Sequence, residues 1–157
     1  MAMIATPMED AMKMRAWWMA VLLGAGGVAH AAGRLEVHDA WVRAIPPGAS
    51  MTAGYATLSN AGDAPVTILT AQSDTFRNVS LHETIVAKDI AKMREVHRLV
   101  VAPGGTIKLE PGGYHLMLVS PRRAIAVGDK VGVTFLMQDG QRIDTSFDVI
   151  EPEAAQD

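Results

Sequence analysis

The sequence predicts an all-β protein of the sandwich or Greek-key type, and three observations support this. Short runs of β-branched and apolar residues recur from residue 35 onward, clusters of Gly, Pro, Asn and Asp separate them, and no helical periodicity lasts longer than two turns. Eight or nine strands at this spacing are typical of sandwiches and Greek-key barrels. The expected strands are Leu35–Ala44, Thr52–Ser59, Val66–Gln72, Asn78–Val86, Ala91–Val101, Thr106–Glu110, Tyr114–Ser120, Lys130–Met137 and Arg142–Ile150.

The segments between the expected strands are rich in residues that favour tight turns. Asp139-Gly140 is the clearest case, and it predicts a two-residue hairpin loop between the last two strands. The other turn segments are Pro46-Pro47-Gly48, Asn60-Ala61-Gly62-Asp63, Pro103-Gly104-Gly105 and Pro111-Gly112-Gly113.

The first 31 residues have the pattern of an export signal. Lys13 and Arg15 precede an apolar run over 16–28, and Ala29-His30-Ala31 forms a small-x-small cleavage site. The apolar run is shorter than the roughly 20 residues needed to cross a bilayer. We therefore expect a signal peptide over 1–31, cleaved near Ala31, and one exported, soluble domain over 32–157 with no membrane span.

The composition excludes several classes of function. The 157 residues contain no cysteine, which excludes disulfides, thiolate zinc sites, thiol nucleophiles, iron–sulfur clusters and copper centres that need a Cys ligand. The 14 basic and 17 acidic residues give no positive excess for a nucleic-acid partner. There is no Gly-x-Ser-x-Gly elbow, paired-carboxylate segment or phosphate loop, so we expect no enzymatic activity.

Side-chain alternation along two expected strands places histidine and methionine on outward faces. In Asn78–Val86, Val79 and Leu81 share the face expected to be buried, so His82 points away from the core. In Tyr114–Ser120, Leu116 and Leu118 form the buried pair. His115 and Met117 then lie side by side on the opposite face, about 7 Å apart along the strand.

A second pairing follows if Asn78–Val86 and Ala91–Val101 form a hairpin around Val86–Asp89. This register places His82 opposite Met93. If this pair meets His115 and Met117, two imidazoles and two thioethers come within reach of one ion. Thioether sulfur is soft and neutral and imidazole is borderline, so Cu(I), one per chain, matches such a set best.

The same residues form a motif: His82, ten residues, Met93, twenty-one residues, then His115-Leu116-Met117. This pattern resembles the periplasmic copper chaperones called PCu(A)C, and the similarity extends over about residues 35–150, including Trp41-Val42-Arg43 and Pro111–Leu118. The resemblance implies a cupredoxin-like β-sandwich in the periplasm that binds Cu(I) at an exposed His₂Met₂ site. It also implies delivery of copper to the CuA centre of cytochrome c oxidase, in which Sco-type copper proteins act together with the chaperone.

Two departures from the family pattern and two other interpretations accompany this resemblance. Residue 83 is Glu where some members have Met, and the tail lacks a His/Met-rich extension, so a second, Cu(II) site is not expected. One alternative is a zinc or other divalent-metal protein that uses His82, His97 and His115 with Glu83 or Glu95. The other is a metal-free β-sandwich that serves as an interaction module.

Overall fold

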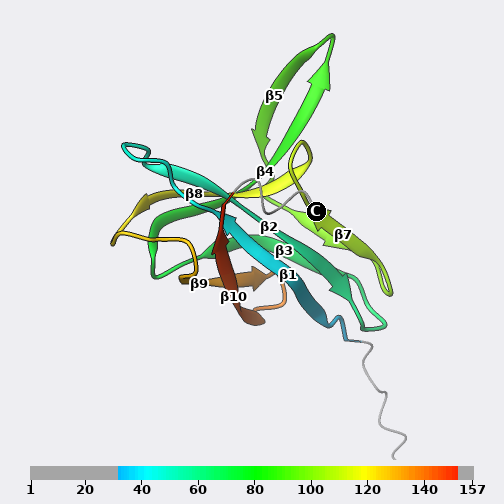
Figure 1. Ribbon diagram of the computed structural model, residues 1–157. Coiled ribbons are helices and arrows are strands. Elements are labelled where there is room, and N and C mark those ends of the chain that lie inside the picture. The colour runs from blue at the N-terminus through cyan, green and yellow to red at the C-terminus, as the bar shows by residue number, and fades with distance from the viewer. Residues whose placement is uncertain (1–31, 152–157) are drawn as a thin grey trace, which may run out of the picture. The chain divides into compact units, whose positions relative to one another are not determined.

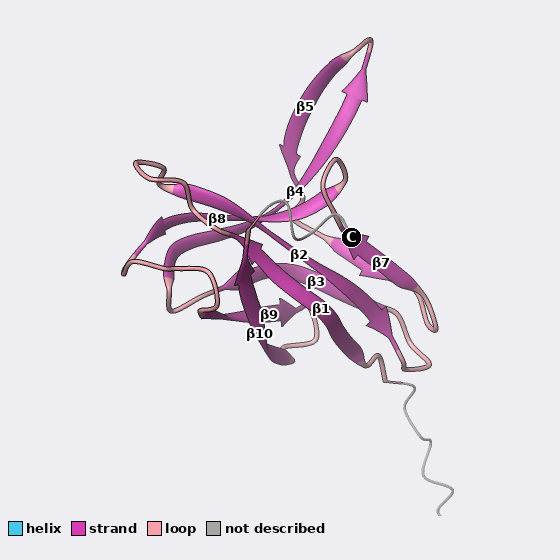
Figure 2. Ribbon diagram, viewed as in Figure 1, coloured by secondary structure: helices cyan, strands magenta, loops and turns pink. Residues whose placement is uncertain are grey.

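The all-β prediction is confirmed in the computed structural model, which describes residues 32–151 (Figures 1 and 2). The predicted signal peptide over 1–31 lies outside the described residues. Within them all regular structure is β-strand, and no helix of the length and apolarity needed to cross a membrane is found there. The strands are β1 (Leu35–Arg43), β2 (Met51–Asn60), β3 (Val66–Gln72), β4 (Phe76–Ala87), β5 (Ile90–Glu95), β6 (Leu99–Val101), β7 (Thr106–Leu109), β8 (Tyr114–Pro121), β9 (Lys130–Met137) and β10 (Arg142–Ile150).

The strands form one continuous ladder in the order β5-β4-β8-β7-β2-β1-β10-β9-β3-β6, with an additional β8–β2 pairing. The β1–β10 pairing is parallel and joins the two halves of the ladder. One core cluster fills the space between the halves. Leu58, Leu81 and Leu116 come from one half, and Ile68 and Phe135 from the other. A single coiled sheet therefore encloses the core of this sandwich.

The prediction of one strand over Ala91–Val101 is wrong, because the structure divides this segment into β5 and β6. β5 pairs with β4, whereas β6 pairs with β3. Residues 96–98 cross between them, and the Val96 N–H donates to the Leu81 carbonyl at 2.8 Å. Because β5 and β6 end the ladder on opposite sides, this short crossing closes the sandwich along one edge.

The β9–β10 hairpin is present, but its loop has three residues, 138–140, where two were predicted. Gly140 has φ = +87° and donates its N–H to the Met137 carbonyl at 3.0 Å. The Met137 N–H in turn donates to the Gln141 carbonyl at 3.0 Å. This is a turn followed by a glycine in the left-handed region, which is the common three-residue hairpin loop.

The β4–β5 hairpin has a different turn from the one predicted. Lys88 and Asp89 alone form its loop, with φ of +51° and +60°, which is a two-residue turn of the I′ kind. His82 therefore lies opposite Glu95, and Met93 lies opposite Thr84, so the predicted His82–Met93 pairing is wrong by two residues. A shift of two residues leaves every side chain on its original face, so Met93 still shares the face of His82.

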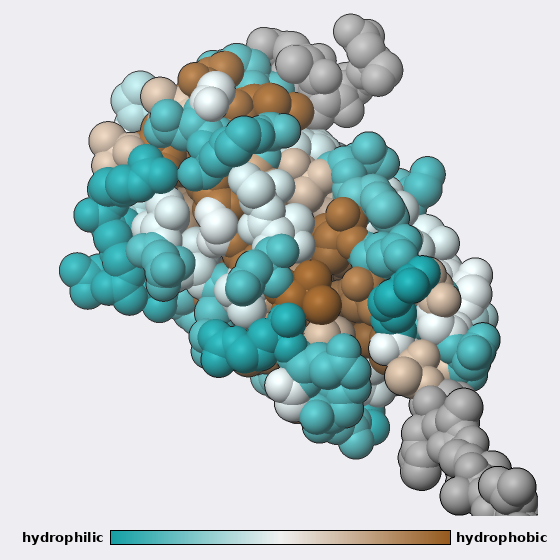
Figure 3. Space-filling view, turned by 90° about the horizontal axis from the view of Figure 1, so that it is seen from below, coloured by the Kyte–Doolittle hydropathy of each residue, from teal (hydrophilic) through white to brown (hydrophobic). Residues whose placement is uncertain are grey.

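The β4–β5 hairpin extends beyond the other strands as an arm (Figure 1). All six residues of β5 are exposed. Figure 3 shows another face of the molecule, where hydrophilic side chains surround smaller apolar patches. The exposed large apolar residues of the arm are Ile85, Val86, Ile90 and Met93.

A buried asparagine ties the end of β2 to its neighbours. Asn60 is 1% exposed, and its side-chain oxygen accepts the N–H groups of Arg34 and Gly62, both at 3.0 Å. Its side-chain nitrogen donates to the carbonyls of Ala64 at 2.7 Å and Val101 at 3.1 Å. All four hydrogen-bonding positions of this amide are bonded to backbone groups, which fixes the segment that enters β1 and the end of β6.

Candidate metal centre

Three neighbouring strands, β5, β4 and β8, carry the four residues of the motif. His82 of β4 pairs directly with His115 of β8. Their chain neighbours Leu81 and Leu116 are buried in the core, so both histidines project from the opposite face of the sheet. The predicted alternation is therefore confirmed in both strands.

The two imidazole rings are stacked, with their centroids 5.8 Å apart and an interplanar angle of 29°. His115 is only 5% exposed, and its Nδ1 lies 3.2 Å from the Gly113 carbonyl oxygen. A carbonyl oxygen only accepts, so this bond places the proton on Nδ1 and leaves the Nε2 lone pair of His115 free. One nitrogen of this ring is thus held in the form that binds a metal.

The position of the Gly113 carbonyl follows from the turn that precedes β8. Gly112 has φ = +83°, and the Gly113 N–H donates to the Glu110 carbonyl at 3.0 Å. With Pro111 before Gly112, this is the sequence of a type II turn, in which the third position favours glycine. The same Gly113 carbonyl accepts the Thr84 N–H at 3.0 Å, which ties the turn to β4.

His82 has one nitrogen bonded and one without a partner. Its Nε2 is 2.9 Å from the Ser80 hydroxyl. Its Nδ1 is buried and has no hydrogen-bond partner among the described residues. Buried polar atoms are nearly always bonded, so a ring nitrogen without a partner beside a second histidine fits the role of a metal ligand. Neither Ser80 nor Gly113 was predicted as a site residue from the sequence, although Ser80 shares the face of His82 by simple alternation.

The register places both methionines on this same face. Met117 follows His115 by two residues and lies between Ala53 of β2 and Ser80 of β4. Met93 is opposite Thr84, one step of alternation from the His82–Glu95 pair, and it is 63% exposed. Methionine has three flexible side-chain bonds and can span the roughly 7 Å between such positions. The strand pairing therefore places the two histidines side by side, with Met117 and Met93 at neighbouring positions of the same face.

The environment of His82 favours the neutral form of its imidazole. Burial lowers the pKa of His82 from its usual value, the neighbouring His115 lowers it further, and Glu95 opposes both effects. Metals bind the neutral form of imidazole, so this shift reduces competition from protons. Burial also raises the pKa of Tyr114, with Glu83 as the second cause.

A lowered pKa in the folded protein makes the stability of the metal-free protein depend on pH. The unfolded chain binds a proton at His82 more readily, so the free energy of unfolding falls as the pH drops below about 6.5. Replacing His82 with asparagine is expected to flatten this dependence between pH 7 and pH 5. Urea unfolding of the metal-free protein at each pH measures it, with His97→Asn as the control. An unchanged pH dependence in His82→Asn would contradict the assignment.

The side chains that the divalent-metal alternative requires do not come together in the described part of the chain. The His97 side chain is 81% exposed and lies beside Glu95, with 3.8 Å between Nδ1 and the carboxylate. Glu83 occupies the face of β4 opposite to His82 and pairs with Arg94 at 2.7 Å. Within residues 32–151, no three His, Asp or Glu side chains gather closely enough to hold a metal.

Two methionines within residues 32–151 lie outside the motif. Met137 is buried in the core cluster. Met51 is half exposed at the start of β2, close to the Pro46–Gly48 loop.

Comparison with known proteins assigns the family. Residues 35–149 match the family described as "Putative lipoprotein LpqE-like". The chain belongs to this LpqE-like family. One relative is the "Putative lipoprotein Lxx21020" of Leifsonia xyli subsp. xyli, 33% identical over 107 residues, which are 68% of this chain and 63% of the relative. Another is the "Uncharacterized protein RP573" of Rickettsia prowazekii, 28% identical over 91 residues, which are 57% of this chain and 50% of that protein.

Solved structures similar to this LpqE-like chain are PCuAC domains and a copper protein. The copper-bound PCuAC domain from PmoF2 has a TM-score of 0.64 at 22% identity, covering 78% of this chain and 97% of that one. CuI-DR1885 from Deinococcus radiodurans has a TM-score of 0.61 at 30% identity, covering 79% and 83%. The chain therefore has the cupredoxin-like β fold of PCuAC domains, and the predicted membership in the PCu(A)C family is confirmed.

Proposed function

We propose that this protein is a copper chaperone, not an enzyme, and that it binds one Cu(I) through His82, Met93, His115 and Met117. The observation that carries the proposal is the stacked pair of histidines, in which His82 has an orphaned buried nitrogen and His115 has a free Nε2. The copper-bound PCuAC domain and CuI-DR1885, both similar to this chain, support the choice of metal.

The donor set suits Cu(I) as a cargo. Two thioethers and two neutral imidazoles match a soft monovalent ion, and none of the four supplies a negative charge. The Gly113 carbonyl holds His115 in the binding tautomer, and Ser80 orients the ring of His82. Because the ligands leave the charge of the ion uncompensated, the ion remains exchangeable and passes to a recipient that offers stronger donors.

The recipient is the CuA centre of a respiratory cytochrome c oxidase, reached together with a Sco-type copper protein. The resemblance of the His82–Met117 motif to the PCu(A)C pattern supports both proposals. The site of action is the periplasm. The lipoprotein names of the family and of the Leifsonia relative support export, as does a chain with no thiol to oxidise. Mixing the copper-loaded protein with a purified metal-free CuA domain tests this, because no transfer of copper would exclude that recipient.

Replacing both motif methionines tests the metal preference. The double change Met93→Leu, Met117→Leu keeps the apolar volume but removes both thioethers, so Cu(I) affinity is expected to fall by about 100-fold. Competition with a Cu(I) chelator measures this, and Met51→Leu is the matched control. A Cu(I) stoichiometry near zero in the unaltered protein would support the metal-free alternative. Tight Zn²⁺ binding that survives the double change would support the divalent-metal alternative.

A further inference from the structure

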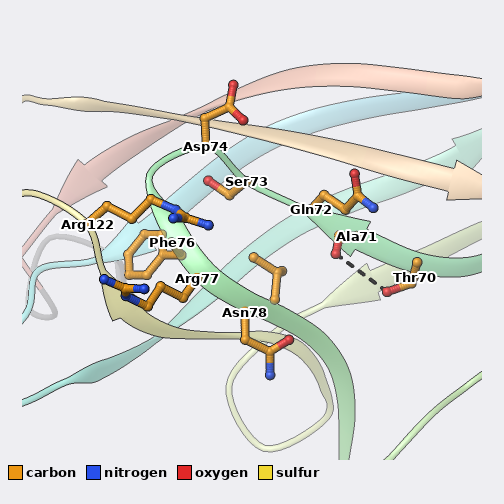
Figure 4. Close-up of a pocket in the computed structure, with 10 residues that line it drawn as sticks. Thr70, Ala71, Gln72, Ser73, Asp74, Phe76, Arg77, Asn78 and Arg122 are labelled. Atoms are coloured by element: carbon orange, nitrogen blue, oxygen red, sulfur yellow. Dashed lines mark hydrogen bonds between the residues drawn. The ribbon is translucent and has the colours of Figure 1, made fainter.

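A cavity opens between β3 and β4, near the loop that joins them. β3 continues into the half of the ladder that contains β9, whereas β4 continues into the half that contains β8, so the two strands diverge from this loop. The cavity has a volume of about 420 Å³, within the range of small-molecule sites. Its wall consists of Thr70–Asp74, Phe76–Val79 and Arg122 (Figure 4).

This cavity is separate from the candidate metal centre. It lies at the beginning of β4, where Phe76 pairs with Pro121, whereas His82 pairs with His115. The wall reaches along β4 as far as Val79, which is three residues or about 10 Å from His82 and is buried on the opposite face of the strand. A ligand in the cavity would therefore make no contact with the copper ligands.

Two arginines from different strands line the cavity without an acidic partner. Arg77 belongs to β4 and Arg122 follows β8, and Figure 4 shows them on either side of the Phe76 ring. Within the described part of the chain neither has a carboxylate within 4.0 Å, whereas Arg94 and Arg123 are both paired. Asp74 is the one acidic residue of the wall, and its carboxylate points away from both guanidinium groups (Figure 4). The cavity is thus left with a net positive wall.

The backbone holds Arg122 at this position. The Arg122 N–H donates to the Thr75 carbonyl in the β3–β4 loop at 2.8 Å. Two residues earlier, Ser120 adopts φ = +55° and donates its N–H to the Ser50 carbonyl at 2.7 Å. A non-glycine residue in this region costs free energy and often marks a functional segment. The bend at Ser120 directs the chain so that Arg122 borders the cavity.

The uncharged groups of the wall complete a surface of hydrogen-bond donors. The side-chain amides of Gln72 and Asn78 belong to it. The Ser73 hydroxyl is already engaged, because it donates to the Gly132 carbonyl at 2.6 Å and accepts the Thr75 N–H at 3.2 Å. Ser73 therefore shapes the loop, while Gln72 and Asn78 add uncharged amides to the wall that the two arginines make positive.

We propose that this cavity is a binding site for a small oxyanion. Two lining guanidinium groups without a carboxylate partner match a ligand with several charged oxygens, since guanidinium pairs with phosphate and carboxylate through parallel hydrogen bonds. Inorganic phosphate and small polycarboxylates such as citrate share this chemistry.

Titration of the metal-free protein with phosphate and, separately, with citrate tests the site at constant ionic strength. Amide chemical shifts are expected to saturate at residues 70–79 and 122 with one of the two anions, which identifies the ligand class. Arg77→Gln and Arg122→Gln are each expected to weaken binding about tenfold, since each removes one charge-assisted pair. Lys108→Gln, on exposed β7, removes the same charge elsewhere and should leave the affinity unchanged.

Two results would overturn the site. One is shifts that stay linear with both anions, and the other is equal weakening by Lys108→Gln. Far-ultraviolet circular dichroism of each variant confirms that it is folded. Because the titration uses metal-free protein, its outcome is independent of whether the copper proposal holds.

Discussion

Cu(I) affinity is expected to fall by more than about 100-fold when His82 and His115 are both replaced with asparagine. The change removes the stacked imidazoles at the centre of the site and leaves two thioethers, which are weaker neutral donors. Asparagine keeps a polar side chain of similar size, so the sheet is expected to remain folded. Competition with a Cu(I) chelator, combined with circular dichroism of the metal-free variant, measures both properties.

The matched control is the double variant His38→Asn, His97→Asn, which alters two exposed histidines outside the motif. It should bind Cu(I) as tightly as the unaltered protein. Equal losses in the two double variants would show that histidine content, and not the β4–β8 pair, determines binding, and the assignment of the site would then be wrong.

The free energy of unfolding is expected to fall by about 3 kcal/mol when Asn60 is replaced with alanine. The change removes four hydrogen bonds and leaves buried backbone groups of the segment before β1 and of β6 without partners. Urea unfolding at pH 7 measures it. Asn78→Ala removes an exposed amide and should change the free energy by less than about 0.5 kcal/mol. A similarly small loss for Asn60→Ala would contradict the role of this residue.

The strands and their outward faces could be predicted from the sequence because alternation is a local property. Val79, Leu81, Leu116 and Leu118 are buried as the pattern required, and this alone placed His82 and His115 on the opposite face. The motif itself then depended on spacing and residue type, which are visible without a structure.

The pairing register and the division of one long strand could not be predicted. Lys88-Asp89 lacks the Asn-Gly or Asp-Gly signature of an I′ turn, so the hairpin loop was expected to be two residues longer than it is. The break between β5 and β6 arises because β5 pairs with β4 whereas β6 pairs with β3. This change of partner depends on tertiary structure and has no local sequence signal. The stacking of His82 on His115 likewise depends on two strands that are distant in sequence.

Because the β4–β5 hairpin is an exposed arm, the fold restricts the side chains of the four motif residues to different degrees. His115 and Met117 sit within the central ladder, and His82 is held between Ser80 and His115, so folding has already restricted their rotamers. Met93 stands on the outermost strand with its side chain largely in solvent. Ordering a free methionine costs about 1.5–2 kcal/mol in side-chain entropy. In the proposed Cu(I) site, Met93 is therefore expected to be the last donor to engage an incoming ion and the first to leave it.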